Sequence, residues 1–383
     1  MTYVNKLQKY LDIFALSLSF KRNDNWLSRV EEHSSNYSTL FSIYSQMLEQ
    51  DQEEFFARSS DKKAIIRSLD RSKLSYSITN NLQLLHILEQ MTPNDPADFL
   101  ILPLRCTVEP PATEGHVFGS YIYKEKDGYK IFLVNKQFKD ASIYFVTIPN
   151  NNMPSVCDQL VLNKYNPHPE QPYYIYHKII EHANGKQITP LSYRMHPQKT
   201  GNCIVKEIEA TVKTALFHCR HDLFASQSLG KIKWNTQPDS VIMMRMYFLD
   251  AIKQEFNGPQ KPFDLLFKLY LQRKERNKIL CFSPFETKKK IHQEIKSEMN
   301  KYPEIQQILS GKNIYEEGIV IKRIDFFSKL SAENQCNLPH NNAKEKVMLF
   351  EKIAKAKEKT EIIFQENSKN KNAKSQVPLS IDQ

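Results

Sequence analysis

Four short apolar runs between residues 99 and 148 constrain the fold most strongly. They are rich in Phe, Tyr, Ile, Leu and Val, and turn residues separate them, which is typical of strands. Asp127-Gly128 lies between the second and third runs, and this dipeptide is a strong hairpin signal. The sequence therefore predicts a mainly antiparallel sheet with strands at 99–104, 117–123, 129–134 and 143–148.

Helical periodicity dominates both sides of this sheet. Apolar residues recur at three- and four-residue steps through the first ninety residues and again after residue 240. We therefore predict an α+β protein in which a small mixed or antiparallel sheet and a central, cysteine-bearing helix are flanked by N- and C-terminal helical regions. The expected division is a helical region at 1–92, a core at 93–258, a second helical region at 259–365 and a disordered tail at 366–383.

Several finer expectations follow from the same patterns. Between Pro149 and Pro197 we expect mostly irregular chain, with one short helix and one edge strand that contains a proline. The short helix is expected at 173–183 and the edge strand at 188–191. After the cysteine-bearing helix we expect a series of helices, at 241–256, 262–276, 285–302, 314–330 and 343–364.

The segment Gln198-Lys199-Thr200-Gly201-Asn202-Cys203 precedes a helical run at 204–220. A helix N-terminus favours a thiolate over a thiol, because its unsatisfied N–H groups carry partial positive charge. Gly201 and Asn202 tolerate the conformations of a tight entry turn. The run is amphipathic, and its polar residues are expected on the face opposite the buried stripe: Lys206, Glu207, Glu209 and Lys213. Taken alone, Cys203 is more simply explained as a small buried residue at a helix start.

A histidine on the hairpin changes that balance. His116 begins the second predicted strand and Asn135 ends the third. The turn at Lys126-Asp127-Gly128 sets pairs of residues whose numbers add to about 253, so His116 faces a position within two residues of Asn135. An amide beside an imidazole fixes its tautomer and orientation. The hairpin therefore supplies a base and its orienting partner for a cysteine nucleophile.

The order His116, Asn135, Gln198, Cys203 resembles the ubiquitin-like-protease clan of cysteine peptidases. The similarity covers roughly residues 98 to 220 and is greatest to deubiquitinase effectors secreted by intracellular bacteria such as Legionella and Coxiella. It implies that Cys203 is the nucleophile, His116 the base, Asn135 the orienting residue and Gln198 an oxyanion donor. Two positions depart from the clan pattern: an asparagine stands where an aspartate is common, and Val117 stands where the SUMO-protease branch often has tryptophan.

The resemblance implies a cysteine isopeptidase that removes ubiquitin or a ubiquitin-like modifier from host or effector proteins. A related effector family uses the same residue order for acetyl transfer from acetyl-CoA, so an acetyltransferase is a second reading. A third is a non-catalytic helical binding module in which Cys203 and His116 are packed residues. No cofactor or metal is expected for the first reading.

Composition limits the partners and the compartment. The formal charge is +10, but lysines are spread along helical segments beside glutamates, which favours solvated helix faces over a nucleic-acid surface. Weak contact of basic helices with an anionic membrane stays open. Six scattered cysteines without CxxC pairs indicate a reducing, cytoplasmic setting. Since neither a Sec-type signal nor a transmembrane run is expected, an effector of this kind would enter the host cytosol by another route.

Overall fold

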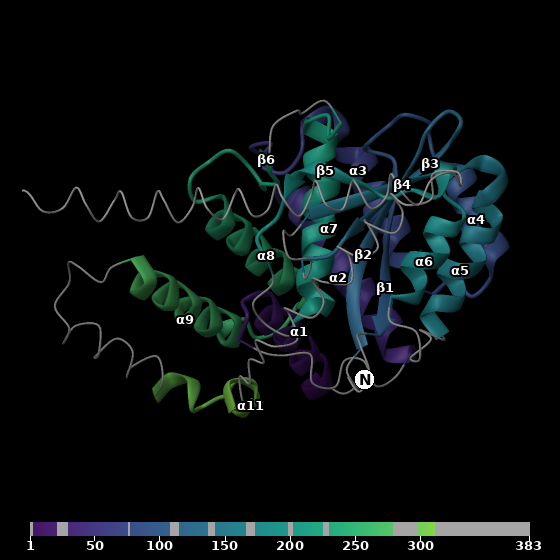
Figure 1. Ribbon diagram of the computed structural model, residues 1–383. Coiled ribbons are helices and arrows are strands. Elements are labelled where there is room, and N and C mark those ends of the chain that lie inside the picture. The colour runs from purple at the N-terminus through teal and green to yellow at the C-terminus, as the bar shows by residue number, and fades with distance from the viewer. Residues whose placement is uncertain are drawn as a thin grey trace, which may run out of the picture. The chain divides into compact units, whose positions relative to one another are not determined.

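The computed structural model describes residues 3–20, 30–75, 77–107, 115–136, 142–165, 173–197, 202–224, 230–278 and 297–310. The chain divides into a unit of residues 1–331 and a unit of residues 332–383, and all described residues lie in the first. Its architecture is α+β, with a six-stranded mixed sheet flanked by helices (Figure 1). The predicted fold class is confirmed at this level.

The sheet follows the order of the chain, β1-β2-β3-β4-β5-β6. The first five strands pair with antiparallel neighbours, and the short β6 pairs with β5 in parallel, which makes the sheet mixed. The four strands predicted from the apolar runs are confirmed, and so is a proline-containing fifth strand, although it is not the edge strand that was predicted, because β6 pairs with it. The strands are β1 (Phe99–Thr107), β2 (Gly115–Lys124), β3 (Gly128–Val134), β4 (Ser142–Pro149), β5 (Thr189–Arg194) and β6 (Gly230–Lys231).

Side chains cover the outer edge of β1. In helix α3 (Ser59–Ser75), the Ser68 hydroxyl accepts from the Phe99 N–H at 3.0 Å, and Ser72 does the same for Ile101 at 2.9 Å. Pro103, the next outward-facing residue, has no N–H to pair. The Asn163 amide bonds both the N–H and the carbonyl of Arg105, at 2.9 and 2.8 Å. The edge is thus closed by short polar side chains.

Helices predicted on the N-terminal side are confirmed as α1 (Tyr3–Ser17), α2 (Val30–Gln50), α3 and α4 (Asn81–Glu89). On the C-terminal side, the two predicted helices at 241–256 and 262–276 are confirmed as α8 (Ser240–Phe256) and α9 (Lys261–Lys278), and α11 (Pro303–Ser310) follows. The predicted helix at 285–302 lies mostly outside the described residues. The predictions for 314–330, 343–364 and the tail at 366–383 lie wholly outside them.

The prediction of irregular chain after Pro149 is wrong for one segment. The 3₁₀ turn Asn150–Asn152 leads into α5 (Met153–Tyr165), a helix of 13 residues. Met153, Val156, Cys157 and Leu160 are buried in it, so a helical period was present in the sequence. The short helix expected at 173–183 is confirmed as α6 (Tyr174–Glu181), and a second 3₁₀ turn, Asn184–Lys186, leads towards β5.

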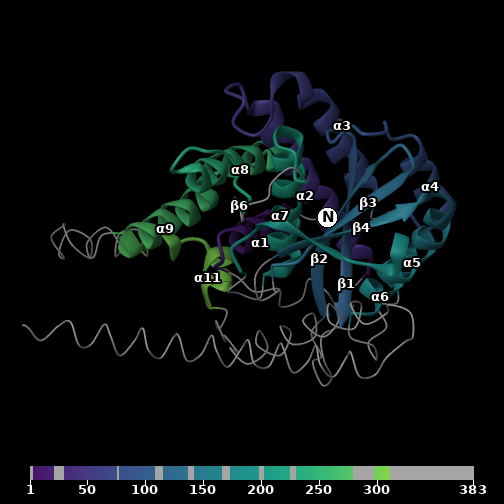
Figure 2. The ribbon, with the colours of Figure 1, turned by 45° about the horizontal axis from the view of Figure 1, so that its top comes forward.

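Different helices pack on the two faces of the sheet. On β2, Phe118 stacks on Tyr176 of α6 with ring centroids 4.3 Å apart. Gly119, which points to the opposite face, lies against Thr211 of α7 (Cys203–Arg220). Figures 1 and 2 show α4, α5 and α6 together on one side of β1 and β2, with α1, α2, α7 and α8 on the other. The His116 end of β2 therefore lies between two helical layers.

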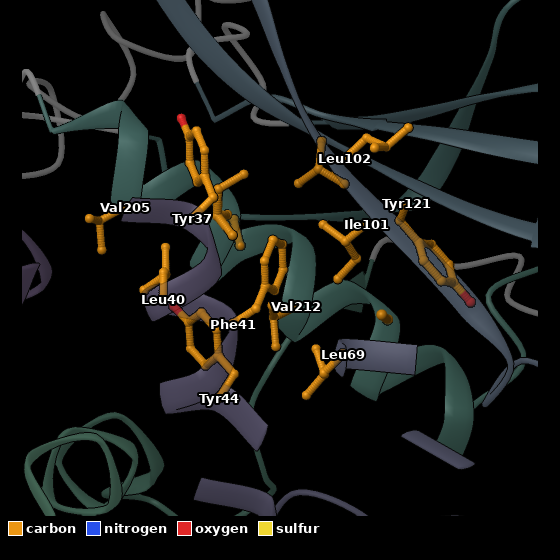
Figure 3. Packing of buried hydrophobic residues seen from close by; sticks show 14 of the residues in the cluster. Tyr37, Leu40, Phe41, Tyr44, Leu69, Ile101, Leu102, Tyr121, Val205 and Val212 are labelled. Atoms are coloured by element: carbon orange, nitrogen blue, oxygen red, sulfur yellow. The ribbon is translucent and has the colours of Figure 1, made fainter. Parts of the chain in front are cut away.

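Helix α7 is central to a single hydrophobic core. Buried apolar residues from Leu7 to Ile308 form one cluster, so the predicted helical regions and the predicted core share it. In Figure 3, Phe41 and Tyr44 of α2 approach Val212 of α7. The expected polar face of α7 is also covered, because Glu207 is fully buried and Lys206 and Glu209 are largely buried. The prediction of an exposed polar face on this helix is therefore wrong.

No helix within the described ranges is long and apolar enough to cross a membrane.

Candidate active site

The hairpin between β2 and β3 brings His116 and Asn135 into contact. The observed register pairs Gly119 with Val134, so paired residue numbers add to 253, as predicted. One further step places Asn135 opposite Phe118, two residues from His116 on the same face. Across this diagonal, His116 Nε2 and Asn135 Oδ1 lie 3.1 Å apart. The predicted neighbours are therefore hydrogen-bonded.

This hydrogen bond determines the protonation of the imidazole. An amide oxygen only accepts, so Nε2 must carry the proton and donate it. In the neutral ring, Nδ1 then holds the lone pair that a general base requires. Both side chains are buried, with 2% of His116 and 3% of Asn135 exposed. The geometry thus fixes one tautomer in a site of low dielectric.

Tyr176 of α6 holds Asn135 from the other side. The Asn135 Nδ2 donates to the Tyr176 hydroxyl at 3.0 Å, which assigns the amide oxygen to His116. Burial raises the pKa of Tyr176 well above 10, and the negative charge of Glu207 adds to the rise, so the phenol stays neutral. Since Phe118 stacks on the same ring, α6 fixes the position of the whole His116–Asn135–Tyr176 chain.

Cys203 is the first residue of α7 and is buried. The Asn202 side chain does not cap the helix; its Nδ2 donates to the Leu16 carbonyl at 2.8 Å and to the Ser19 hydroxyl at 3.3 Å. Asn202 has φ −124°, which any residue adopts, so the expected need for a tolerant turn residue does not apply to it. Its role is to anchor the start of α7 to the end of α1.

Two contacts define how α7 runs along β2. A Cβ on Gly119 would lie 1.7 Å from Thr211 Oγ1, and the Tyr121 hydroxyl lies 2.8 Å from His218 Nδ1. Residue numbers rise together in both elements, so helix and strand run in the same direction. Thr211 is about 12 Å along the helix from Cys203, and Gly119 is about 10 Å along the strand from His116. Cys203 therefore lies at the His116 end of the sheet.

Glu207 ties the first turns of α7 to the residue after Asn135. Its Oε2 accepts a hydrogen bond from the Lys136 N–H at 2.9 Å. Glu207 follows Cys203 by four residues, so the two share one side of the helix. His116 and Asn135 point towards α6, whereas Gly119 points towards α7, so the imidazole and helix α7 lie on opposite faces of β2. The Glu207–Lys136 bond shows that the first turns of α7 reach the end of β3.

The four predicted site residues thus have different outcomes. His116 and Asn135 are hydrogen-bonded, Cys203 lies at the same end of the sheet, and Gln198 lies outside the described residues. Sequence reasoning missed Tyr176 and Glu207. The spacing of four residues between Cys203 and Glu207 was a visible signal, but nothing in the sequence indicated that this carboxylate is buried.

No group of three or more His, Cys, Asp or Glu side chains in the described part of the chain is arranged to hold a metal ion. Two of the three other described cysteines have a raised pKa: burial raises the pKa of the Cys157 thiol to about 12 and that of the Cys219 thiol further still. Both are thiols at neutral pH.

No family model, curated protein or solved structure matches the chain.

Proposed function

We propose that this protein is a cysteine isopeptidase that cleaves the bond after the C-terminal glycine of ubiquitin or a ubiquitin-like modifier. The hydrogen bond between His116 and Asn135 carries the proposal, because it leaves a base nitrogen at the end of the sheet where the Cys203 helix begins. The residue order of the ubiquitin-like-protease clan supplies the substrate class. Modified host or effector proteins would be the substrates of a bacterial effector of this kind.

The proposed reaction is acyl transfer through a thioester. His116 Nδ1 takes the Cys203 proton, and Sγ attacks the carbonyl carbon after the modifier's terminal glycine. Collapse of the tetrahedral intermediate breaks the C–N bond, and the imidazolium returns its proton to the leaving amine. Water, deprotonated by His116, then attacks the thioester, releasing the modifier's carboxylate and restoring the thiol. The clan pattern assigns the oxyanion to Gln198 and the Cys203 N–H.

Glu207 has a positioning role in this scheme. Asn135 orients the imidazole but carries no charge to stabilise an imidazolium. A buried carboxylate beside Lys136 supplies negative charge at the same end of the sheet, and its influence reaches Tyr176, the partner of Asn135. In a buried site such a charge acts more strongly than at the surface. It favours the imidazolium form of His116.

The test is labelling with C-terminal electrophiles. Wild-type protein and the Cys203→Ala variant would each be incubated with probes built on ubiquitin, SUMO and other ubiquitin-like modifiers. The expected result is an adduct with at least one probe, mapped by mass spectrometry to Cys203 and absent from the variant. Matched thermal melts would show that both proteins are folded.

Other outcomes separate the remaining functions. If every probe fails and acetyl-CoA instead acetylates Cys203, the acetyltransferase reading replaces the isopeptidase. If neither reagent modifies Cys203 and Cys203→Ala changes stability alone, the chain is better described as a binding module.

A further inference from the structure

A second charged cluster lies along α7. Residues 206, 209 and 213 recur at helical spacing and so share one side of the helix. Glu209 Oε1 accepts from Arg245 Nη2 of α8 at 2.6 Å, and its Oε2 accepts from Lys206 Nζ at 3.3 Å. Both carboxylate oxygens are therefore engaged. Only 3% of the Arg245 side chain, 14% of Lys206 and 12% of Glu209 are exposed.

Positive charge exceeds negative charge in this cluster. Lys136 and Lys213 also act on Glu209, so four cationic side chains surround one carboxylate. Burial, opposed by these cations, leaves the pKa of Glu209 at about 2, so it is always ionised at neutral pH. Burial and the neighbouring cations lower the pKa of Lys213 to about 8 and that of Lys206 well below 10.5. The cluster is short of negative charge.

Two buried hydrogen-bond donors in the described part of the cluster lack an acceptor, and they indicate where an anion could bind. Within the described residues, Arg245 Nη1 and the Tyr44 hydroxyl have no hydrogen-bond partner. Tyr44 is 1% exposed, and its electrostatic neighbours are Glu209 and Arg245, so both donors belong to this cluster. Figure 3 shows Tyr44 on α2 beside α7. A buried donor without an acceptor costs about 1 to 3 kcal/mol, and two in one place are rarely left unsatisfied.

We propose that the cluster between α2, α7 and α8 binds an oxyanion of the phosphate class. A tetrahedral anion presents several acceptor oxygens, and the donors of the cluster come from three helices: the Tyr44 hydroxyl from α2, Lys206 and Lys213 from α7, and Arg245 Nη1 from α8. Its charge offsets the excess of cations around Glu209. The proposal uses none of His116, Asn135 and Cys203, so it stands even if the isopeptidase assignment fails.

The test is a titration of the full chain with inorganic phosphate while thermal unfolding is followed. Phosphate stays in the millimolar range and chloride holds the ionic strength constant, because high phosphate stabilises most proteins without binding. The wild-type midpoint should rise and saturate. Glycerol 2-phosphate forms a second arm: equal binding indicates a phosphate group carried on an organic molecule, and weaker binding indicates a free ion.

Variants locate the effect. Tyr44→Phe and Lys213→Met should each weaken the apparent affinity roughly tenfold, the factor for about 1.4 kcal/mol from one hydrogen bond to a charged group. Tyr44→Phe should fold normally in chloride, because it removes a hydroxyl that has no partner there. Lys178→Met, which alters an exposed pair with Glu181, is the control and should bind as wild type does. An unsaturable wild-type response, or equal affinities in all variants, would overturn the site.

Discussion

Gly119 and Thr211 are in direct contact where β2 meets α7. A Cβ on Gly119 would lie 1.7 Å from Thr211 Oγ1 and 2.7 Å from its Cβ. Because Thr211 Oγ1 also donates to the Glu207 carbonyl at 2.7 Å, it cannot move aside freely. This contact sets the height of α7 on the sheet and, through the helix, the position of Cys203.

We therefore expect Gly119→Ala to lower the free energy of unfolding by about 1 to 3 kcal/mol, the usual cost of overpacking. Urea unfolding measures the loss. Thr211→Ala removes the closest atom, so the double variant should be less destabilised than the sum of the two single changes. Additive effects would mean that the two residues do not clash.

Replacing Asn135 tests the orientation of His116. Asn135→Ala removes the acceptor for Nε2–H and should slow alkylation of Cys203 by iodoacetamide roughly tenfold at neutral pH, about the value of one buried hydrogen bond. Asn135→Asp keeps an acceptor and adds charge, so it should react at least as fast as wild type. The rate is read on the Cys203 peptide by mass spectrometry, since the chain has five other cysteines. A wild-type rate for Asn135→Ala would exclude this role.

Glu207 should affect the pH dependence of the same reaction. The Glu207→Gln variant keeps an acceptor for the Lys136 N–H but removes negative charge that favours the imidazolium form of His116, on which the thiolate depends. The pH midpoint for alkylation of Cys203 should rise by roughly 0.5 to 1 unit. Glu181→Gln, on the exposed surface of α6, is the matched control and should leave the midpoint unchanged. Superimposable profiles for Glu207→Gln and wild type would show that Glu207 is purely structural.

His218 should make stability depend on pH. It is buried among aromatic rings, and burial lowers its pKa from 6.5 to about 4. Since the unfolded chain takes up the proton first, stability is complete above pH 6.5 and falls as pH drops towards 4, by about 3 kcal/mol at most. Urea unfolding at pH 7 and pH 4.5 measures the change.

His218→Gln should flatten this dependence, because glutamine does not titrate yet can still form a hydrogen bond with the Tyr121 hydroxyl. The variant should therefore lose less stability than wild type between the two pH values. An unchanged pH slope would assign the acid sensitivity to other groups.

Local sequence patterns correctly predicted the hairpin register and the position of helix α7. The Asp127-Gly128 turn fixed the hairpin register, and that register alone placed His116 beside Asn135. The start of α7 at Cys203 also followed from periodicity. Helix α5 was missed because three asparagines precede it and Pro154 stands in its first turn, where proline is in fact tolerated.

Features that depend on contacts between residues far apart in the sequence could not be predicted. Lys206 and Glu209 resemble a solvent-exposed face in sequence, but α8 covers them, and its Arg245 gives the buried Glu209 an ion-pair partner. Glu207 likewise depends on the backbone of Lys136, 71 residues away. The two-residue β6 exists because Tyr193 and Arg194 offer it a partner. No periodicity within a segment encodes such contacts.

The covered edge of β1 determines how this sheet can grow. Serine hydroxyls of α3 and the Asn163 amide already occupy the peptide groups that a seventh strand would need, and Pro103 offers no donor. An extended peptide could pair there only after α3 and α5 had been displaced. Any partner that recognises the chain by strand addition must therefore use a different edge.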